Sequence, residues 1–126
     1  MIVVAALFAG LAALLHVYIF VLESITFRDS GRKVFGVRDD AEARIVERWA
    51  FNQGFYNLFL AVGAGVGAIL LVVGDARIGS VLVFLAAGSM FGAGSVLLAT
   101  DRRLIRGALV QMIPAGLAVL TTALSL

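Results

Sequence analysis

The sequence predicts an all-α integral membrane protein, a four-helix bundle made of two helical hairpins. The chain has 126 residues, of which 62% are hydrophobic and only 14% are charged, and its mean hydropathy is +1.07. Its apolar residues form four stretches, each close to the roughly 20 residues that a helix needs to cross a bilayer. A soluble core of this size is too small to bury so much apolar surface. We therefore expect residues 1–126 to form a single transmembrane domain.

The first helix is expected over about residues 2–27. Residues 2–22 are almost wholly apolar, and no basic residue precedes them, unlike the start of a secretory signal peptide. We therefore expect this helix to be retained in the protein. A charged, glycine-punctuated loop is expected to follow over about residues 28–40.

The second helix is expected over about residues 41–73, with Asp39 or Asp40 as its N-cap. At 1.5 Å per residue it would be roughly 48 Å long, which exceeds the roughly 30 Å thickness of the hydrocarbon layer. Its first turns are amphipathic, and they should therefore project into water.

The third helix is expected over about residues 77–99, after a short turn at residues 74–76. The fourth helix is expected over about residues 102–126, and Asp101 is placed to cap it. Each half of the chain would then cross the membrane and return.

Basic residues predict the orientation in the membrane. Of the 10 Lys and Arg residues, only Arg77 lies at the end of the bundle that holds the termini. The others lie at the opposite end, and positively charged connections tend to stay in the cytoplasm. We therefore expect a multi-pass protein with both termini on the non-cytoplasmic side. Because these residues lie beside apolar ends, membrane lipid is the expected partner and nucleic acid is not.

Polar side chains within the apolar stretches gather toward the cytoplasmic ends of the helices. If Phe27, Trp49 and Arg102 mark the cytoplasmic boundary, the helical rise places these side chains about 5–16 Å inside the membrane. Uncompensated polar groups are costly in hydrocarbon, so this set needs partners or water. It is therefore the expected site, a polar cavity that faces the cytoplasm. Its members are His16, Glu23, Asn52, Gln53, Asn57 and Gln111.

Two members of this set are ionisable. Glu23 is the only acid inside an apolar stretch, and His16 is the only histidine in the chain. Joined by amides, the pair could bind a polar headgroup, relay a proton, or act as general base and acid. The same polar side chains could instead hold the bundle together. No metal is expected, because amides are poor additional ligands for a transition metal.

The chain shows no cofactor motif. It has no cysteine, and it lacks the nucleotide-binding, nucleophile-elbow and zinc-binding patterns. We therefore expect no cofactor. In the charged loop, Val34, Phe35 and Val37 are flanked by basic residues, and they could form either a membrane anchor or a lid over the cavity.

Small residues and a proline predict local packing. Glycines at both ends of residues 63–67 and 88–92 allow helix backbones to approach closely, either within the bundle or between protomers. Pro114 is expected to bend the fourth helix and to free the carbonyl of Val110.

Four motifs together resemble a known family: H-V-Y-I-F-V-L-E at residues 16–23, K-V-F-G at 33–36, N-Q-G-F-Y-N-L-F-L-A at 52–61 and Q-M-I-P-A at 111–115. They resemble the small bacterial integral membrane proteins catalogued as domain of unknown function 1304, over essentially the whole chain. The resemblance implies a four-helix protein of the bacterial inner membrane, and it supplies no activity. It also marks Tyr18, Gly54, Tyr56 and Pro114 as family-like positions. The expected ligand-binding residues are then His16, Tyr18, Glu23, Asn52, Gln53, Tyr56, Asn57 and Gln111.

Three kinds of function remain open from the sequence. The first is binding or transport of a small polar molecule or a lipid headgroup, and transport through so narrow a bundle would need a homo-oligomer. The second is an intramembrane enzyme with Glu23 as base and His16 as acid, acting on a lipid or a small polar substrate. The third is an accessory subunit whose polar side chains meet a partner helix. Because the outer halves of the helices carry few polar groups, we expect the cavity to be closed on the outer side.

Overall fold

Four long apolar helices make up almost all of the protein. The structure, a computed structural model, describes residues 1–126 and contains no strand. Its four candidate membrane spans are Ile2–Ile25, Asp40–Val73, Ala76–Thr100 and Arg102–Ala123, each long and apolar enough to cross a bilayer. The prediction of an all-α, multi-pass membrane protein is therefore confirmed at this level.

Two of the spans contain irregular turns. The first span consists of α1 (Ile2–Phe20) and a π-helical turn, η1 (Val21–Ile25). The last consists of a 3₁₀ turn, η3 (Arg102–Leu104), and α5 (Ile105–Ala123). The other two spans are the continuous helices α3 (Asp40–Val73) and α4 (Ala76–Thr100).

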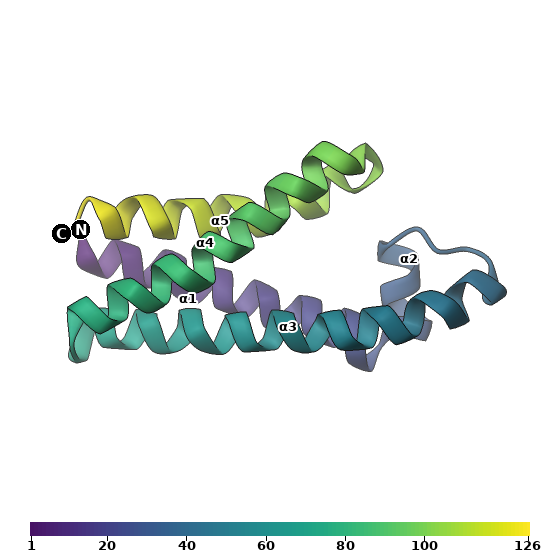
Figure 1. Ribbon diagram of the computed structural model, residues 1–126, viewed down its shortest axis with the longest axis horizontal. Helices are drawn as coiled ribbons and strands as arrows, with labels where there is room; N and C mark the ends of the chain where they lie inside the picture. Colours follow the sequence, from purple (N-terminus) through teal and green to yellow (C-terminus); the bar gives the residue numbers. More distant parts are fainter.

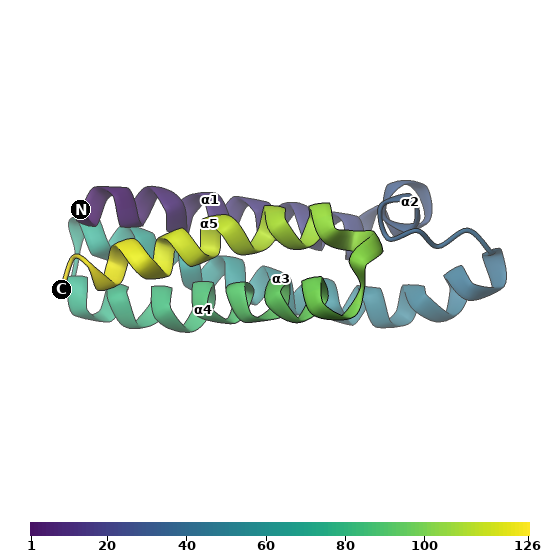
Figure 2. The ribbon, with the colours of Figure 1, turned by 90° about the horizontal axis from the view of Figure 1, so that it is seen from above.

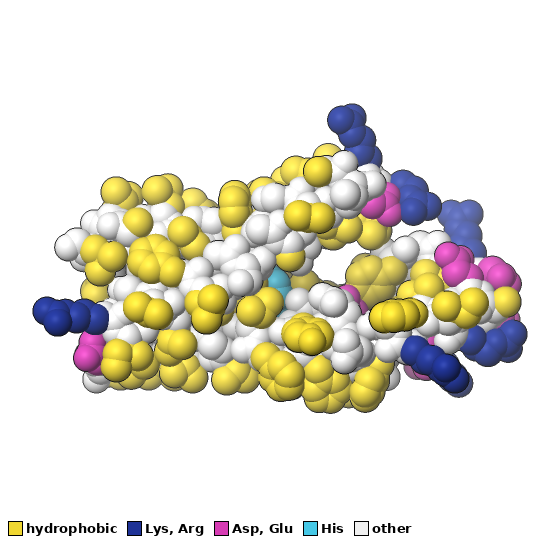
Figure 3. All heavy atoms as spheres, in the orientation of Figure 1, with side chains coloured by type: hydrophobic (Ala, Val, Ile, Leu, Met, Phe, Trp, Pro, Cys, Tyr) yellow, Lys and Arg dark blue, Asp and Glu magenta, His cyan; other side chains and the backbone are white.

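The helices form a bundle in which α1 packs on α3 and α5, and α4 packs on the same two helices. Figures 1 and 2 show both termini at one end, beside the turn between α3 and α4. We call this the terminal end. The opposite end holds the long connection between α1 and α3 and the short turn between α4 and α5. Because nearly all Lys and Arg residues lie there, we call it the charged end (Figure 3).

Small residues hold the terminal half of the bundle together. Ala5, Ala9 and Ala12 of α1 are fully buried, as are Ala64 of α3 and Ala118 of α5. Short side chains let helix backbones come close, and close packing is a main source of helix association in lipid. This half of the protein therefore has little internal space.

The two glycine pairs behave differently. A Cβ added at Gly67 would lie 2.9 Å from Val83 Cγ2, and one added at Gly63 would lie 3.3 Å from Ala86 Cβ, so both face α4. A Cβ at Gly88 or Gly92 would meet nothing within 4 Å. The first pair therefore closes the hairpin of α3 and α4, whereas the second faces outward.

The connection between α1 and α3 is more ordered than the loop expected over residues 28–40. It contains a second π-helical turn, η2 (Phe27–Gly31), and a short helix, α2 (Arg32–Val34). Phe27 is buried, and Gly31 lies so close to the Leu22 carbonyl that a side chain there would collide with it. The connection therefore contains helical turns in addition to the expected loop, and the close approach of Gly31 to Leu22 folds it back onto the end of α1.

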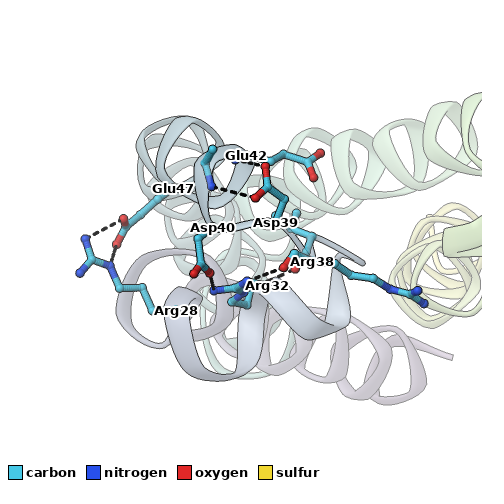
Figure 4. A network of polar contacts seen from close by, with 9 residues as sticks. Arg28, Arg32, Arg38, Asp39, Asp40, Glu42 and Glu47 are labelled. Carbon is cyan, nitrogen blue, oxygen red and sulfur yellow. Dashed lines mark hydrogen bonds and ion pairs between the residues drawn. The ribbon is translucent and has the colours of Figure 1, made fainter.

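Ion pairs fasten this segment to the start of α3 (Figure 4). Arg28 donates to both carboxylate oxygens of Glu47, at 2.8 and 3.0 Å. Arg32 donates to Asp40 at 2.7 Å and to the carbonyl of Arg38 at 2.8 Å. Exposed pairs such as these add little stability individually. Their effect is to fix the direction in which α2 leaves the bundle.

The helix caps follow the sequence prediction. The Asp39 carboxylate accepts from the amides of Ala41 and Glu42, and it caps α3. The Asp101 carboxylate accepts from the amide of Arg103 at the start of the last span. The first turns of α3 extend beyond the other long helices, as Figure 1 shows.

Candidate functional site

A cavity of about 490 Å³ lies between the helices at the charged end. Every long helix contributes to its walls, and 10 of the 17 lining residues are hydrophobic. Figure 3 shows the molecule hollowed here, between the end of α4–α5 and the end of α2–α3. Ligand sites in proteins commonly combine apolar walls with a few polar groups.

One carboxylate and three amide side chains line this cavity. Glu23 comes from η1, Gln53 and Asn57 from α3, and Gln111 from α5. The amide nitrogen of Asn57 donates to Glu23 Oε2 at 2.7 Å, and Asn57 is only 8% exposed. A carboxylate and three amides therefore converge on one space, and they offer both acceptors and donors to a ligand.

The π-helical turn η1 sets the position of Glu23. A π turn inserts an extra residue into a helix and changes the direction of the side chains that follow, and such turns are frequent at functional sites. The hydroxyl of the next residue, Ser24, donates to the carbonyl of Phe51 in α3 at 2.9 Å. Together with the bond from Asn57, this contact joins the end of the first span to α3.

Gly54 makes this close approach sterically feasible. A Cβ at Gly54 would collide with the Ser24 hydroxyl and would lie 3.1 Å from Glu23 Cβ. The N-Q-G-x-Y-N motif thus has a local explanation: Gln53 and Asn57 are one turn apart on the face that lines the cavity, and Gly54 admits η1 beside them.

Two arginines from the last span lie at the mouth of the cavity. Arg103 donates to both carboxylate oxygens of Asp101, at 3.0 and 2.9 Å, and this bonding holds the pKa of Asp101 below its usual range. Arg106 also lines the cavity, and it makes no ion pair. The mouth therefore holds one neutralised guanidinium group and one free guanidinium group.

The segment after η2 covers part of the cavity. Val34 and Phe35 belong to the lining, and Val37 is buried. The next position, Gly36, has a φ of 73°, a conformation that favours glycine. Of the two roles open from the sequence, this placement agrees with a lid.

Three of the predicted site residues lie elsewhere. His16 is 1% exposed, and its Nδ1 lies 2.9 Å from the Ala12 carbonyl of its own helix, so Nδ1 is the donor. Tyr56 is exposed and does not line the cavity. Asn52 lies on an outer surface beside Arg44 and Trp49. The cavity thus gathers five of the predicted residues: Tyr18, Glu23, Gln53, Asn57 and Gln111.

Sequence reasoning included Gln111 of the last span but missed Arg103, Arg106 and Gly107. Arg103, Gly107 and Gln111 are spaced i, i+4 and i+8, which is the repeat of one helical face, and all three line the cavity. This spacing from Gln111 is a signal that could have identified Arg103 and Gly107. The basic residues were instead interpreted as determinants of membrane orientation and as neighbours of membrane lipid.

The lining also includes Val110, whose carbonyl precedes Pro114 by one helical turn. Proline has no N–H group, so this carbonyl lacks its usual helical donor. No group of three or more His, Cys, Asp or Glu side chains is arranged to hold a metal ion.

Four apolar spans and a polar cavity at one end define a small helical, multi-pass membrane protein. A family model described as "Protein of unknown function (DUF1304)" matches residues 10–123. The chain therefore belongs to the DUF1304 family, which confirms the resemblance seen in its motifs. Searches of curated proteins and of solved structures found no match.

Proposed function

We propose that this protein binds a small polar molecule or a lipid headgroup in the cavity at its charged end. The observation that carries this proposal is the convergence of Glu23, Gln53, Asn57 and Gln111 on one space of about 490 Å³ with mainly apolar walls. Ligand cavities are typically about 300–1,000 Å³, so a compact headgroup or metabolite would fit this space.

The orientation is part of the proposal. Both connections at the charged end carry basic residues, and only Arg77 is basic at the terminal end. The positive-inside rule then places the cavity mouth on the cytoplasmic face of the bacterial inner membrane and both termini outside. The ligand would enter from the cytoplasm or from the inner leaflet.

Binding is better supported than passage through a single chain. Beyond the cavity, the bundle is closed by alanines such as Ala9, Ala64 and Ala118, which are fully buried. This packing leaves no polar route toward the terminal end. Transport would therefore require a second chain to complete the path, and a homo-oligomer remains a prediction tied to transport alone.

The enzyme alternative loses one of its two expected groups. Glu23 lines the cavity, but His16 does not, and the His16 Nδ1 is already bonded within α1. A general base without its expected acid supports binding more directly than catalysis.

Native mass spectrometry of gently extracted protein tests the proposal. The chain offers a matched pair of amides: Gln53 lines the cavity and its neighbour Asn52 does not. A bound molecule should be retained by the wild type and by Asn52→Ala, and it should be lost from Gln53→Ala and Glu23→Gln. If all four folded proteins carry the same species or none, the cavity is not a ligand site.

A further inference from the structure

Two ionisable side chains of opposite type, Glu23 and Arg106, line the cavity without pairing with each other. The structure contains three ion pairs, and neither Glu23 nor Arg106 belongs to any of them. The hydrogen-bond donor to Glu23 is a neutral amide, that of Asn57. Glu23 lies inside a membrane span, where an ionised side chain without a countercharge is costly, and such groups commonly mark functional sites.

The two groups border the same space on neighbouring elements. Glu23 lies in η1, near the end of the first span, and Arg106 lies in the first turn of α5, near the start of the last span. Both residues line the cavity, and α1 packs against α5.

A ligand with a single sign of charge would match only one of these groups. An anion would pair with Arg106 and be repelled by Glu23, and a cation would do the reverse. Resting on the proposed function, we propose that the cavity takes a zwitterion in which a phosphate faces Arg106 and a primary ammonium group faces Glu23. Phosphoethanolamine has this chemistry, either as a free molecule or as the headgroup of a phospholipid.

The surrounding groups fit both ends of such a molecule. Arg103 uses Nε and Nη2 for Asp101, so its Nη1 stays free to donate to a phosphate beside Arg106. At the other end, an ammonium group has three donors. The Glu23 carboxylate and the amide oxygens of Gln53 and Gln111 can accept them.

The lining also explains how a lipid could supply the headgroup. Tyr18 and Val110 border the cavity, and both are more than half exposed. Lipid chains could therefore extend past these residues while the headgroup stays inside. A free phosphoethanolamine molecule would enter from water through the mouth.

Lipid competition in native mass spectrometry tests this inference. The purified full-length protein is mixed with phosphatidylethanolamine, phosphatidylcholine and phosphatidylglycerol of identical chains. Phosphatidylcholine has no N–H donor, and phosphatidylglycerol has no cation. The wild type should prefer phosphatidylethanolamine over both by about tenfold or more, the size of a charged hydrogen bond.

Two variants separate the charges, and each leaves the fold intact by design. Glu23→Gln keeps an acceptor for Asn57, and it should abolish the preference for phosphatidylethanolamine over phosphatidylglycerol. Arg106→Gln removes the positive charge at the exposed mouth, and it should weaken the binding of phosphatidylethanolamine and of phosphatidylglycerol to the same extent. Circular dichroism and Asn52→Ala serve as controls for folding and for unspecific loss.

The outcomes distinguish this inference from the proposed function. Two results would refute a zwitterionic ligand: equal binding of phosphatidylglycerol and phosphatidylethanolamine to the wild type, or an unchanged preference in Glu23→Gln. Neither result would contradict the proposal that the cavity binds a ligand. If no lipid and no free phosphoethanolamine binds, the zwitterionic ligand is refuted, whereas the proposed function is decided separately by whether the gently extracted protein retains a bound molecule. If free phosphoethanolamine displaces bound phosphatidylethanolamine, the ligand is the soluble molecule. If it does not displace the lipid, the ligand is the lipid headgroup. Either result supports a zwitterionic ligand.

Discussion

Replacing Gly54 with alanine should separate the first span from α3 at the site. The added Cβ would collide with the Ser24 hydroxyl and would lie 3.1 Å from Glu23 Cβ and 3.3 Å from the Phe20 carbonyl. The Ser24 hydroxyl can rotate away only by giving up its bond to the Phe51 carbonyl, and Glu23 Cβ and the Phe20 carbonyl must shift by a few tenths of an ångström. The end of the first span is therefore expected to move away from α3.

Gly54→Ala should lower the free energy of unfolding for two reasons. Overpacking a close contact costs about 1–3 kcal/mol. Moving η1 also weakens the bond from Ser24 to the Phe51 carbonyl and the bond from Asn57 to Glu23, each worth roughly 0.6 kcal/mol between membrane helices. Gly54→Ala should therefore lower the free energy of unfolding by about 2–4 kcal/mol.

Unfolding in mixed micelles with increasing dodecyl sulfate measures this difference. Gly92→Ala is the matched control, because a Cβ there meets nothing within 4 Å. The control should unfold like the wild type and retain the cavity ligand, whereas Gly54→Ala should lose both stability and ligand. If the two variants behave alike, the argument that Gly54 admits η1 to the site is wrong.

Three further predictions concern the carboxylates and the orientation. Asn57→Ala should lower the free energy of unfolding by about 0.5–1.5 kcal/mol, the size of one hydrogen bond, because the half-buried Glu23 carboxylate loses its amide donor. The loss should be smaller in a Glu23→Ala background, and equal losses in the same dodecyl sulfate titration would contradict the bond. In an NMR titration the Asp101 carboxyl should have its midpoint below the ordinary value of 3.8 and return toward it in Arg103→Gln. Because the pKa of Asp101 is lowered by folding, its stabilising effect is present above that ordinary value and is lost as the pH falls through the lowered one; an unchanged midpoint in the variant would refute the pairing. Since the chain has no cysteine, a membrane-impermeant thiol reagent on intact cells should label Ser125→Cys and not Ser30→Cys; the reverse pattern would overturn the proposed orientation.

The four spans could be predicted because length and hydropathy are sufficient to identify them. The caps at Asp39 and Asp101 could be predicted because a capping side chain acts on amides within a few residues of itself. Depth along each helix also follows from sequence position alone. These properties are local, so no knowledge of the packing was needed.

The rotation of each helix could not be predicted in the same way. In water, the apolar face of a helix identifies its buried side, but in lipid both faces are apolar. Asn52 and Gln53 are neighbours in the sequence at nearly equal depth, yet only Gln53 lines the cavity. The same holds for His16: its side chain is buried away from the cavity, and its Nδ1 donates to the Ala12 carbonyl of its own helix.

The irregular turns near the site could not be predicted from the sequence either. The π-helical form of residues 21–25 depends on contacts with α3, through Ser24 and Glu23. The fold of residues 27–34 depends on the close approach of Gly31 to Leu22. Such contacts join residues from different elements, and a single sequence carries no direct record of them.

The tightly packed alanines of the terminal half have a kinetic consequence for the charged end. Helices in such close contact cannot separate without exposing backbone, so amide hydrogen exchange should be slowest there. Opening of the cavity is then expected at the charged end, where the segment from Phe27 to Val37 is fastened by exposed ion pairs. The rate at which a ligand enters and leaves can therefore change through this short segment while the resistance of the protein to unfolding stays the same.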